Sequence, residues 1–172
     1  MTRLRDEIRQ TKPFKSAAEE AFLSVLRTAD ELSRRSAEAL KPFGISSTQY
    51  NVLRILRGAG PRGLPCREIG TRMITHDPDV TRLLDRLEAN GLIQRTRGEQ
   101  DRRVITTRIS EAGLRLLQDL DGIVDECLRS VTGSLAEPQL KTLTKLLERM
   151  RQGAGAQTAS SVTTRQVPTK RR

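Results

Sequence analysis

The sequence predicts a mainly α-helical protein with a small antiparallel β-ribbon, and three features indicate this fold class. Apolar residues recur every three to four positions over long segments near both ends of the chain. Between these segments, residues 94–109 hold two short runs rich in threonine, isoleucine and arginine, as in paired strands. Glycine and proline separate the segments, so several helices and one hairpin are expected.

Composition favours a polyanionic partner. The 172 residues include 31 Lys and Arg against 21 Asp and Glu, a formal net charge of +10. Residues 153–172 carry four bases and no acid, so they supply four of these ten charges. An excess of basic residues can also serve only to keep a protein soluble. Aromatic residues are 2% of the chain, which argues against a stacking platform for single-stranded nucleic acid.

The two cysteines, Cys66 and Cys127, lie far apart and form neither a disulfide framework nor a metal-ligand pattern. The sequence contains no long apolar run typical of a secretory signal or a membrane span. We therefore expect a soluble cytoplasmic protein without a metal or other cofactor. An enzyme is the least favoured class, because no nucleophile–base constellation or phosphate-binding glycine loop is apparent.

A basic N-terminal arm is expected over residues 1–15, followed by a long helix in residues 16–45. This helix should run from Ser16 to Lys41 and end at Pro42 and Gly44. One apolar seam follows it at helical spacing, through Ala18, Phe22, Val25, Ala29, Leu32, Ser36 and Ala39.

Residues 46–109 are expected to form a compact domain of three short helices and the ribbon. The first helix begins after the cap candidates at residues 46–49 and ends near Arg57, and residues 58–63 form a loop. The second begins at Pro65, with Ile69 and Met73 turned inward.

The third helix, residues 77–90, has the clearest boundaries. Asp77 is a good N-cap and Pro78 suits the first helical position, while Gly91 accepts the left-handed conformation that ends a helix. Its buried face is expected at Val80, Leu83, Leu84 and Leu87. A helix-turn-helix with an appended ribbon and arginines at its tip favours DNA binding, with the helix in the major groove and the tip in the minor groove.

Residues 110–152 are expected to hold two further helices, the first capped by Ser110 and broken at Gly133, the second beginning at Pro138. From Gly153 to residue 172 the apolar period is lost, so a disordered basic tail is expected. The outer helices carry more apolar surface than the central domain can cover. A homodimer packed about a twofold axis would bury it.

Four stretches together carry a family resemblance: STQYNVLRILRG, LPCREIGTRM, DVTRLLDRLEANGLIQR and EQDRRVITTRISEAGLRLL. Their order and spacing closely resemble the MarR family of winged helix-turn-helix regulators, over about residues 16–150. The resemblance implies a winged helix-turn-helix, with a small antiparallel β-wing, flanked by long dimerisation helices. It also implies a dimer on pseudo-palindromic DNA, usually a repressor, whose affinity a small ligand or oxidant often lowers.

Residues 77–90 then correspond to the family's recognition helix and residues 94–108 to its wing. The resemblance assigns Asp101 to orienting an arginine of the wing tip, since a carboxylate two residues away preorganises the guanidinium. The candidate DNA contacts are Thr75, His76, Asp79, Thr81, Arg82 and Arg86 of the recognition helix, and Arg95, Arg97, Arg102 and Arg103 of the wing.

The recognition helix departs from the family pattern at its start. Many members have Ser, Arg or Thr where this chain has residues 76–79, His-Asp-Pro-Asp. Residues 76–90 hold two arginines and four acids, a net of −2, whereas residues 94–108 hold five arginines and two acids, a net of +3. Asp79 either accepts a hydrogen bond from a cytosine amino group or serves only to cap the helix. Most electrostatic attraction should then come from the wing.

Two single residues allow alternative interpretations. His76 has no second ligand type nearby and suits a loop or a phosphate contact better than a metal site. Cys66 lies in the first turn of its helix, where a reactive thiolate is favoured, or it simply fills a tight turn. The cysteine near the first helix that oxidant-sensing members use has no counterpart here. A helical interaction module without DNA binding is a third alternative, suggested by the acidic recognition helix.

Overall fold

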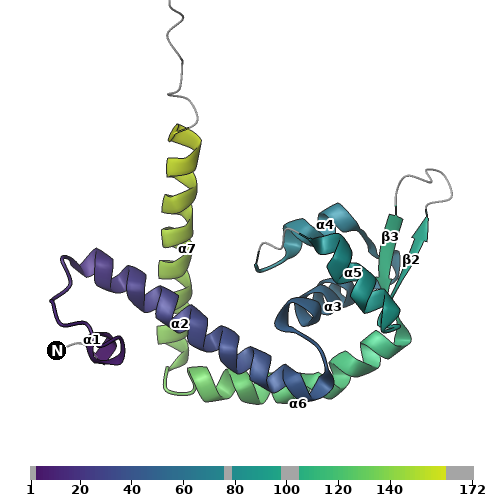
Figure 1. The fold of residues 1–172 in the computed structure, drawn as a ribbon, viewed down its shortest axis with the longest axis horizontal. Helices are drawn as coiled ribbons and strands as arrows, with labels where there is room; N and C mark the ends of the chain where they lie inside the picture. Colours follow the sequence, from purple (N-terminus) through teal and green to yellow (C-terminus); the bar gives the residue numbers. More distant parts are fainter. Residues whose placement is uncertain (1–2, 76–78, 98–104, 162–172) are drawn as a thin grey trace, which may run out of the picture. The chain divides into compact units, whose positions relative to one another are not determined.

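The computed structural model describes residues 3–75, 79–97 and 105–161 (Figure 1). The chain divides into two compact units, Met1–Cys127 and Leu128–Arg172. Within the described residues, no helix is both long enough and apolar enough to cross a membrane.

The first unit is mostly helical, with a small antiparallel sheet, so the predicted fold class is confirmed. Its strands are β1 (Leu64–Pro65), β2 (Ile93–Arg97) and β3 (Ile105–Ile109), and their order β1-β3-β2 places β3 in the centre. Ile93 pairs with Ile109, and Arg97 with Ile105. The elements in chain order are α1 (Arg3–Glu7), α2 (Ala17–Leu40), α3 (Ser47–Ala59), β1 (Leu64–Pro65), α4 (Cys66–Arg72), α5 (Val80–Ala89), β2 (Ile93–Arg97), β3 (Ile105–Ile109) and α6 (Glu111–Thr132).

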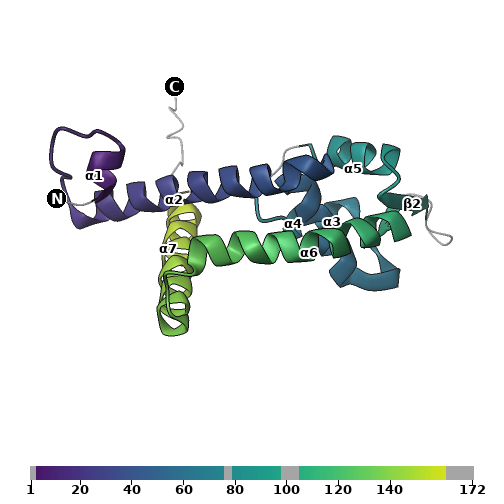
Figure 2. The same ribbon diagram turned by 90° about the horizontal axis from the view of Figure 1, so that it is seen from below.

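Local capping explains where the first helices begin. The Ser16 hydroxyl accepts the Glu19 N–H at 3.2 Å, and Ser46 forms a reciprocal capping box with Gln49 at the start of α3. Gly44, at a φ of 69°, provides the left-handed turn between α2 and α3. In Figure 2, α2 extends as a long helix away from the region of α3, α4 and α5.

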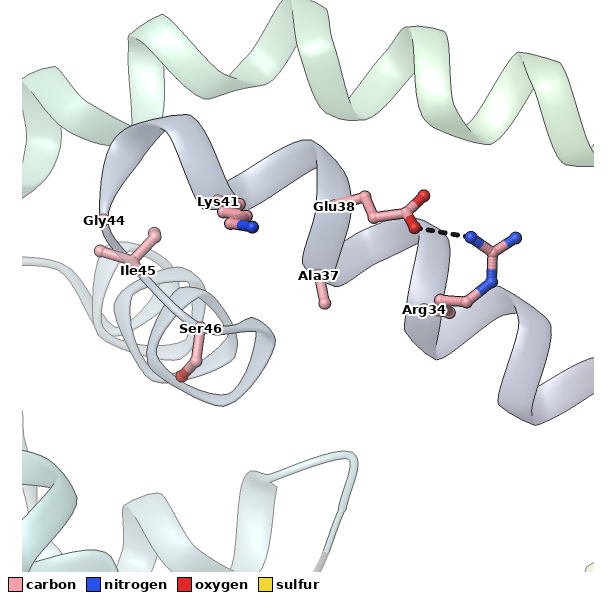
Figure 3. A pocket seen from close by; sticks show the side chains of 7 residues that line it. All are labelled: Arg34, Ala37, Glu38, Lys41, Gly44, Ile45 and Ser46. Carbon is pink, nitrogen blue, oxygen red and sulfur yellow. Dashed lines mark hydrogen bonds and ion pairs between the residues drawn. The ribbon is translucent and has the colours of Figure 1, made fainter.

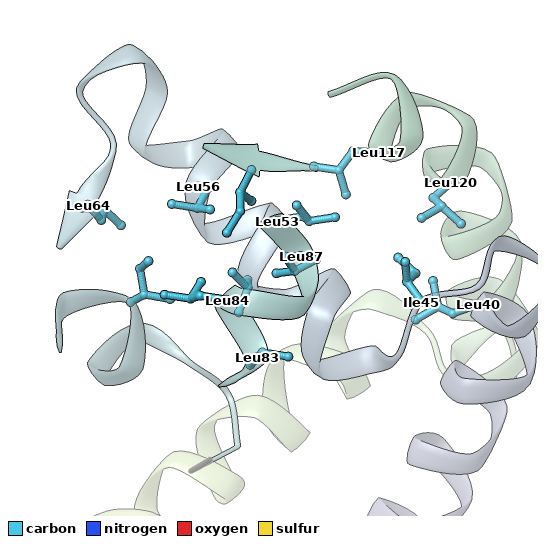
Figure 4. Packing of buried hydrophobic residues seen from close by; sticks show 13 residues of the cluster. Leu40, Ile45, Leu53, Leu56, Leu64, Leu83, Leu84, Leu87, Leu117 and Leu120 are labelled. Carbon is cyan, nitrogen blue, oxygen red and sulfur yellow. The ribbon is translucent and has the colours of Figure 1, made fainter. Parts of the chain in front are cut away.

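A single apolar core lies among α3, α4, α5, β2 and the first half of α6 (Figure 4). Leu53 and Leu56 of α3 and Leu87 of α5 are fully buried there, together with Leu117 and Leu120 of α6. Leu40 and Ile45, at the junction of α2 and α3, close the end of this core. The core therefore fixes α5 from behind and leaves its opposite face exposed.

Two expectations for the first unit need correction. Residues 58–63 are not wholly a loop, because α3 continues to Ala59 and Gly60–Arg62 forms a 3-10 turn. The two-residue strand β1 was not predicted. It pairs with Thr107 and Thr106 of β3, and a strand this short leaves no period in a sequence.

The second unit consists of the end of α6 and the helix α7 (Glu137–Ser161). The Gln139 side chain accepts the Ala136 N–H at 2.8 Å and caps its start. The backbone of α7 is helical as far as Ser161, past Gly153, where the basic tail is expected to begin. Residues 162–172 lie outside the described residues.

Candidate nucleic-acid interface

The N-cap of α5 is Asp79 rather than the predicted Asp77. The Asp79 carboxylate accepts the backbone N–H of Arg82 at 3.0 Å, and its other oxygen lies 3.3 Å from Arg82 Nε. Asp79 therefore caps the helix, which was one of the two roles expected for it beside a contact with cytosine. His76, Asp77 and Pro78 lie outside the described residues.

The end of α5 is a glycine turn of the predicted kind. Gly91 has a φ of 69°, the Leu92 N–H donates to the Leu87 carbonyl at 3.0 Å, and the Gly91 N–H donates to the Glu88 carbonyl at 2.8 Å. These two bonds form a Schellman motif, which satisfies the last carbonyls of the helix. The chain then enters β2 directly.

The two faces of α5 differ sharply in polarity. Leu83, Leu84 and Leu87 are buried, whereas Thr81, Arg82 and Arg86 are exposed. Arg82 and Arg86 lie one helical turn apart on the same flank, and the Arg82 side chain is 72% exposed. Among the described residues, the Arg86 guanidinium has no partner. This flank can donate hydrogen bonds to an acidic ligand.

The opposite flank of α5 is acidic and is paired with β2. Arg95 Nη2 lies 2.6 Å from Asp85 Oδ1 and 2.5 Å from Glu88 Oε2, and Arg95 Nε donates to Glu88 Oε2 at 2.8 Å. These hydrogen bonds lower the pKa of Glu88 and raise that of Arg95. Arg95 was predicted as a wing contact, but its guanidinium is held against the helix and its side chain is only 23% exposed.

The remaining predicted residues divide into exposed and undescribed ones. Thr75 is exposed in the segment before α5, and Arg97 is exposed at the last position of β2. Asp101, Arg102 and Arg103 lie outside the described residues. The structure therefore brings Arg82, Arg86 and Thr81 together on α5 and places Arg97 in the adjoining strand.

Two positioning contacts were not found by sequence reasoning. Asn51 Oδ1 on α3 accepts the backbone N–H of Ile74, which ties the residues just after α4 to α3. Arg108 of β3 donates to the Pro61 carbonyl at 2.8 Å and to Thr96 Oγ1 at 2.9 Å. Both contacts join residues distant in sequence, and neither has a spacing pattern that would have revealed it.

Cys66 is the first residue of α4 and packs, partly buried, against the apolar core. Cys127 of α6 is also partly buried. Within the described ranges, no group of three histidine, cysteine or acidic side chains is placed to hold a metal ion.

A shallow pocket of about 500 Å³ lies where α2 meets the start of α3 (Figure 3). Arg34 Nη1 and Glu38 Oε1 form an ion pair of 2.6 Å at this pocket. The complete lining consists of Arg34, Ala37, Glu38, Lys41, Gly44, Ile45 and Ser46.

The MarR family model matches residues 45–105, the segment that contains α3, α4, α5 and β2. A MarR transcription factor from Planctomyces limnophilus is 40% identical, with 79% of this chain and 98% of that chain covered and a TM-score of 0.62. The Bacillus subtilis HTH-type transcriptional regulator YwoH, itself uncharacterized, is 37% identical over 86 residues, which span 50% of this chain and 61% of YwoH.

The fold also matches S. aureus MepR in a complex with DNA. That chain is 24% identical, with 76% of this chain and 96% of MepR covered and a TM-score of 0.69. The shared helices and sheet, the family model and the 40% identical relative lead to one conclusion. The chain belongs to the MarR family of transcriptional regulators.

Proposed function

We propose that this chain is a homodimeric regulator that binds double-stranded DNA sequence-specifically, at a pseudo-palindromic operator. The observation that carries the proposal is the exposed flank of α5, where Arg82 and Arg86 project from a helix whose other face is buried. An α-helix fits the major groove, and guanidinium groups donate to guanine edges and phosphates. Arg97 adds an exposed cation at the end of β2, the strand that follows the helix.

Family membership supports a role in transcription, and the fold is shared with a MepR chain bound to DNA. The charge distribution supports the same function. The acids at the ends of α5 are engaged in a cap and in ion pairs with Arg95, which reduces their repulsion of a polyanion. The exposed guanidinium groups of Arg82 and Arg86 therefore remain as the positive charges on the solvent side of α5.

Exposed apolar side chains support the homodimer. In the first unit, Phe22 and Leu26 of α2 are 57% and 52% exposed. In the second unit, Leu143, Leu146 and Met150 of α7 are exposed in the same way. Large exposed apolar residues at helical spacing are typical of an interface, and a second copy of this chain is the partner that the family implies.

The pocket at the junction of α2 and α3 supports control by a small effector. A ligand there would contact α2 and also residues 44–46, which lead into α3. Because α3 packs against α4 and α5 through the common core, such binding would change the position of the DNA-contacting helix. We propose that the chain is a repressor that this effector releases from DNA.

In an alternative form of control, oxidation of the Cys66 thiol would change DNA affinity. Its position at the start of α4, packed against the core, would transmit oxidation to the helices around it. DNA affinity is to be compared before and after mild peroxide, in the unsubstituted protein and in Cys66→Ser. An identical response of both proteins removes this alternative.

The decisive experiment selects bound sequences from a random pool of duplex DNA and measures affinity at several salt concentrations. We expect a footprint with two half-sites about 10 base pairs apart, and one dimer per site. Affinity should fall steeply with salt, since phosphate neutralisation releases counterions. Dimerisation without salt-dependent binding to any selected DNA would reject the proposal and favour a helical interaction module.

A further inference from the structure

The ion-pair cluster between α5 and β2 suggests a role for Arg95 that differs from DNA contact. Asp85 and Glu88 lie three residues apart and share one flank of α5. Arg95 reaches both carboxylates from the neighbouring strand, and its backbone N–H also donates to Glu88 Oε1 at 3.2 Å. One residue of β2 thus binds the helix through its main chain and its side chain.

The geometry leaves Arg95 little freedom to bind a phosphate. Its Nε and Nη2 groups are both engaged, and the side chain is 23% exposed, compared with 72% for Arg82. Turning the guanidinium toward DNA would leave two carboxylates without a partner beside a polyanion. Such a rearrangement would lose charge-assisted hydrogen bonds and add repulsion.

The charge balance of α5 depends on the same cluster. The described helix and its cap hold Asp79, Asp85 and Glu88 against Arg82 and Arg86, a net of −1. Adding Arg95 brings this balance to zero. At physiological salt the screening length is about 8 Å, so carboxylates on a DNA-facing helix would still act on nearby phosphates.

We propose that Arg95 is a positioning residue that masks Asp85 and Glu88 from DNA phosphates and fixes α5 against β2. The inference rests on the proposed DNA-binding function and refines it. Arg95 acts through the two carboxylates rather than through the ligand. Its importance for DNA affinity therefore depends on the presence of those charges.

The experiment compares four proteins on the same selected operator: the unsubstituted chain, Arg95→Met, Asp85→Asn with Glu88→Gln, and the triple variant. We expect Arg95→Met to bind about tenfold more weakly or worse, because two carboxylates are unmasked. The double variant should bind at least as well as the unsubstituted chain. The triple variant should bind within about threefold of the double variant, since nothing remains to be masked.

A direct phosphate contact gives a different pattern. The triple variant would then bind much more weakly than the double variant, and its salt slope would be smaller by about 0.9. That result would overturn the inference while leaving the proposed function intact. Failure of the unsubstituted chain to bind any selected DNA would instead reject the proposed function and this inference with it.

Two controls separate masking from loss of structure. Arg97→Met removes an exposed arginine from the same strand, and its effect should persist in the background of the double variant. Thermal unfolding of all variants measures folding separately from DNA affinity. Should Arg95→Met fail to fold, the comparison of the double with the triple variant decides, since neither contains an unmasked carboxylate at positions 85 and 88.

Discussion

The hydroxyl of Ser110 donates a hydrogen bond to the carbonyl oxygen of Gly91 at 2.6 Å. The same hydroxyl accepts the backbone N–H of Gly113 at 3.0 Å, so one buried side chain joins the turn after α5 to the start of α6. We expect Ser110→Ala to lower the free energy of unfolding by about 1–3 kcal/mol, because a cap and a carbonyl partner are both lost.

Urea denaturation measures this change. The matched control is Ser33→Ala, at an exposed position within α2, which should leave stability unchanged or raise it slightly. Equal stability of Ser110→Ala and the unsubstituted protein would contradict the capping role.

Gly113 allows α6 to approach the turn after α5. A Cβ at this position would lie 2.3 Å from the backbone oxygen of Leu92. Gly113→Ala should therefore destabilise the protein by about 2 kcal/mol or more, since backbone atoms must move.

Gly122 of the same helix is a matched control, because a Cβ there meets nothing within 4 Å. Gly122→Ala should stabilise the helix by up to about 1 kcal/mol, as expected from helix propensity. Thermal unfolding of both variants checks the pair, and a similar effect of the two substitutions would contradict the steric argument.

The pair of Glu88 and Arg95 should make stability depend on acid pH. Hydrogen bonds from the Arg95 guanidinium hold the pKa of Glu88 below its ordinary value of 4.5. The stability that this pair contributes is present above the unfolded-state pKa and is lost as pH falls through the lowered folded-state pKa.

We therefore expect the stability difference between the unsubstituted protein and Glu88→Gln to shrink as pH falls below 4.5. Denaturant titrations from pH 7 to about pH 3 measure this difference, and the subtraction removes carboxyl groups common to both proteins. A difference independent of pH over this range would show that the ion pair contributes no net stability.

Arg82 and Arg86 should contribute separately to DNA binding. Arg86→Ala is expected to reduce affinity and, if the guanidinium neutralises a phosphate, to lower the salt slope by about 0.9. If it reads a guanine edge instead, discrimination at one base pair should fall by about 1–3 kcal/mol with little change in slope.

Lys145→Ala is the control for net charge, because it removes one exposed cation from α7. Fluorescence anisotropy with the selected operator at several salt concentrations measures both proteins. Equal affinities of the two variants would argue against a direct contact by Arg86.

The exposed seam of α2 should determine the oligomeric state. Phe22→Asp places a charge where a 57% exposed aromatic side chain would be covered by a second copy. We expect the dimer to dissociate at micromolar concentration, as measured by sedimentation velocity.

Ile105→Asp makes a comparable apolar-to-acid change on β3, at a residue that is 42% exposed. This control should remain a dimer. A monomeric unsubstituted protein, or a Phe22→Asp variant that stays dimeric, would contradict the assignment of this seam.

Periodicity predicted the buried leucines of α5 and those of the first half of α6, where Leu117 and Leu120 face the core. Chain ends and caps were less well predicted. Asp77 and Asp79 are equally good caps in isolation, and the N-cap of α5 is Asp79. The helix α7 continues past Gly153 to Ser161, although residues 153–161 have no apolar period in the sequence.

The candidate site was predicted in its parts but not in its pairings. Arg82 and Arg86 were recognised from their places on one helix. The role of Arg95 depends on how β2 lies against α5 after the turn at Gly91, because that position brings Arg95 to Asp85 and Glu88. A count of charges along the chain does not give this position. The link from Asn51 to Ile74 is of the same kind.

Only Asn90, Gly91 and Leu92 separate α5 from β2, and the turn satisfies its own backbone bonds. Helix and strand consequently keep their mutual orientation whatever side chains occupy positions 82 and 86 of α5. Under the proposed function, duplicated copies of such a gene can acquire new operators by surface substitutions alone. Divergence of specificity then costs little stability, because the residues that choose the bases are not those that hold the fold.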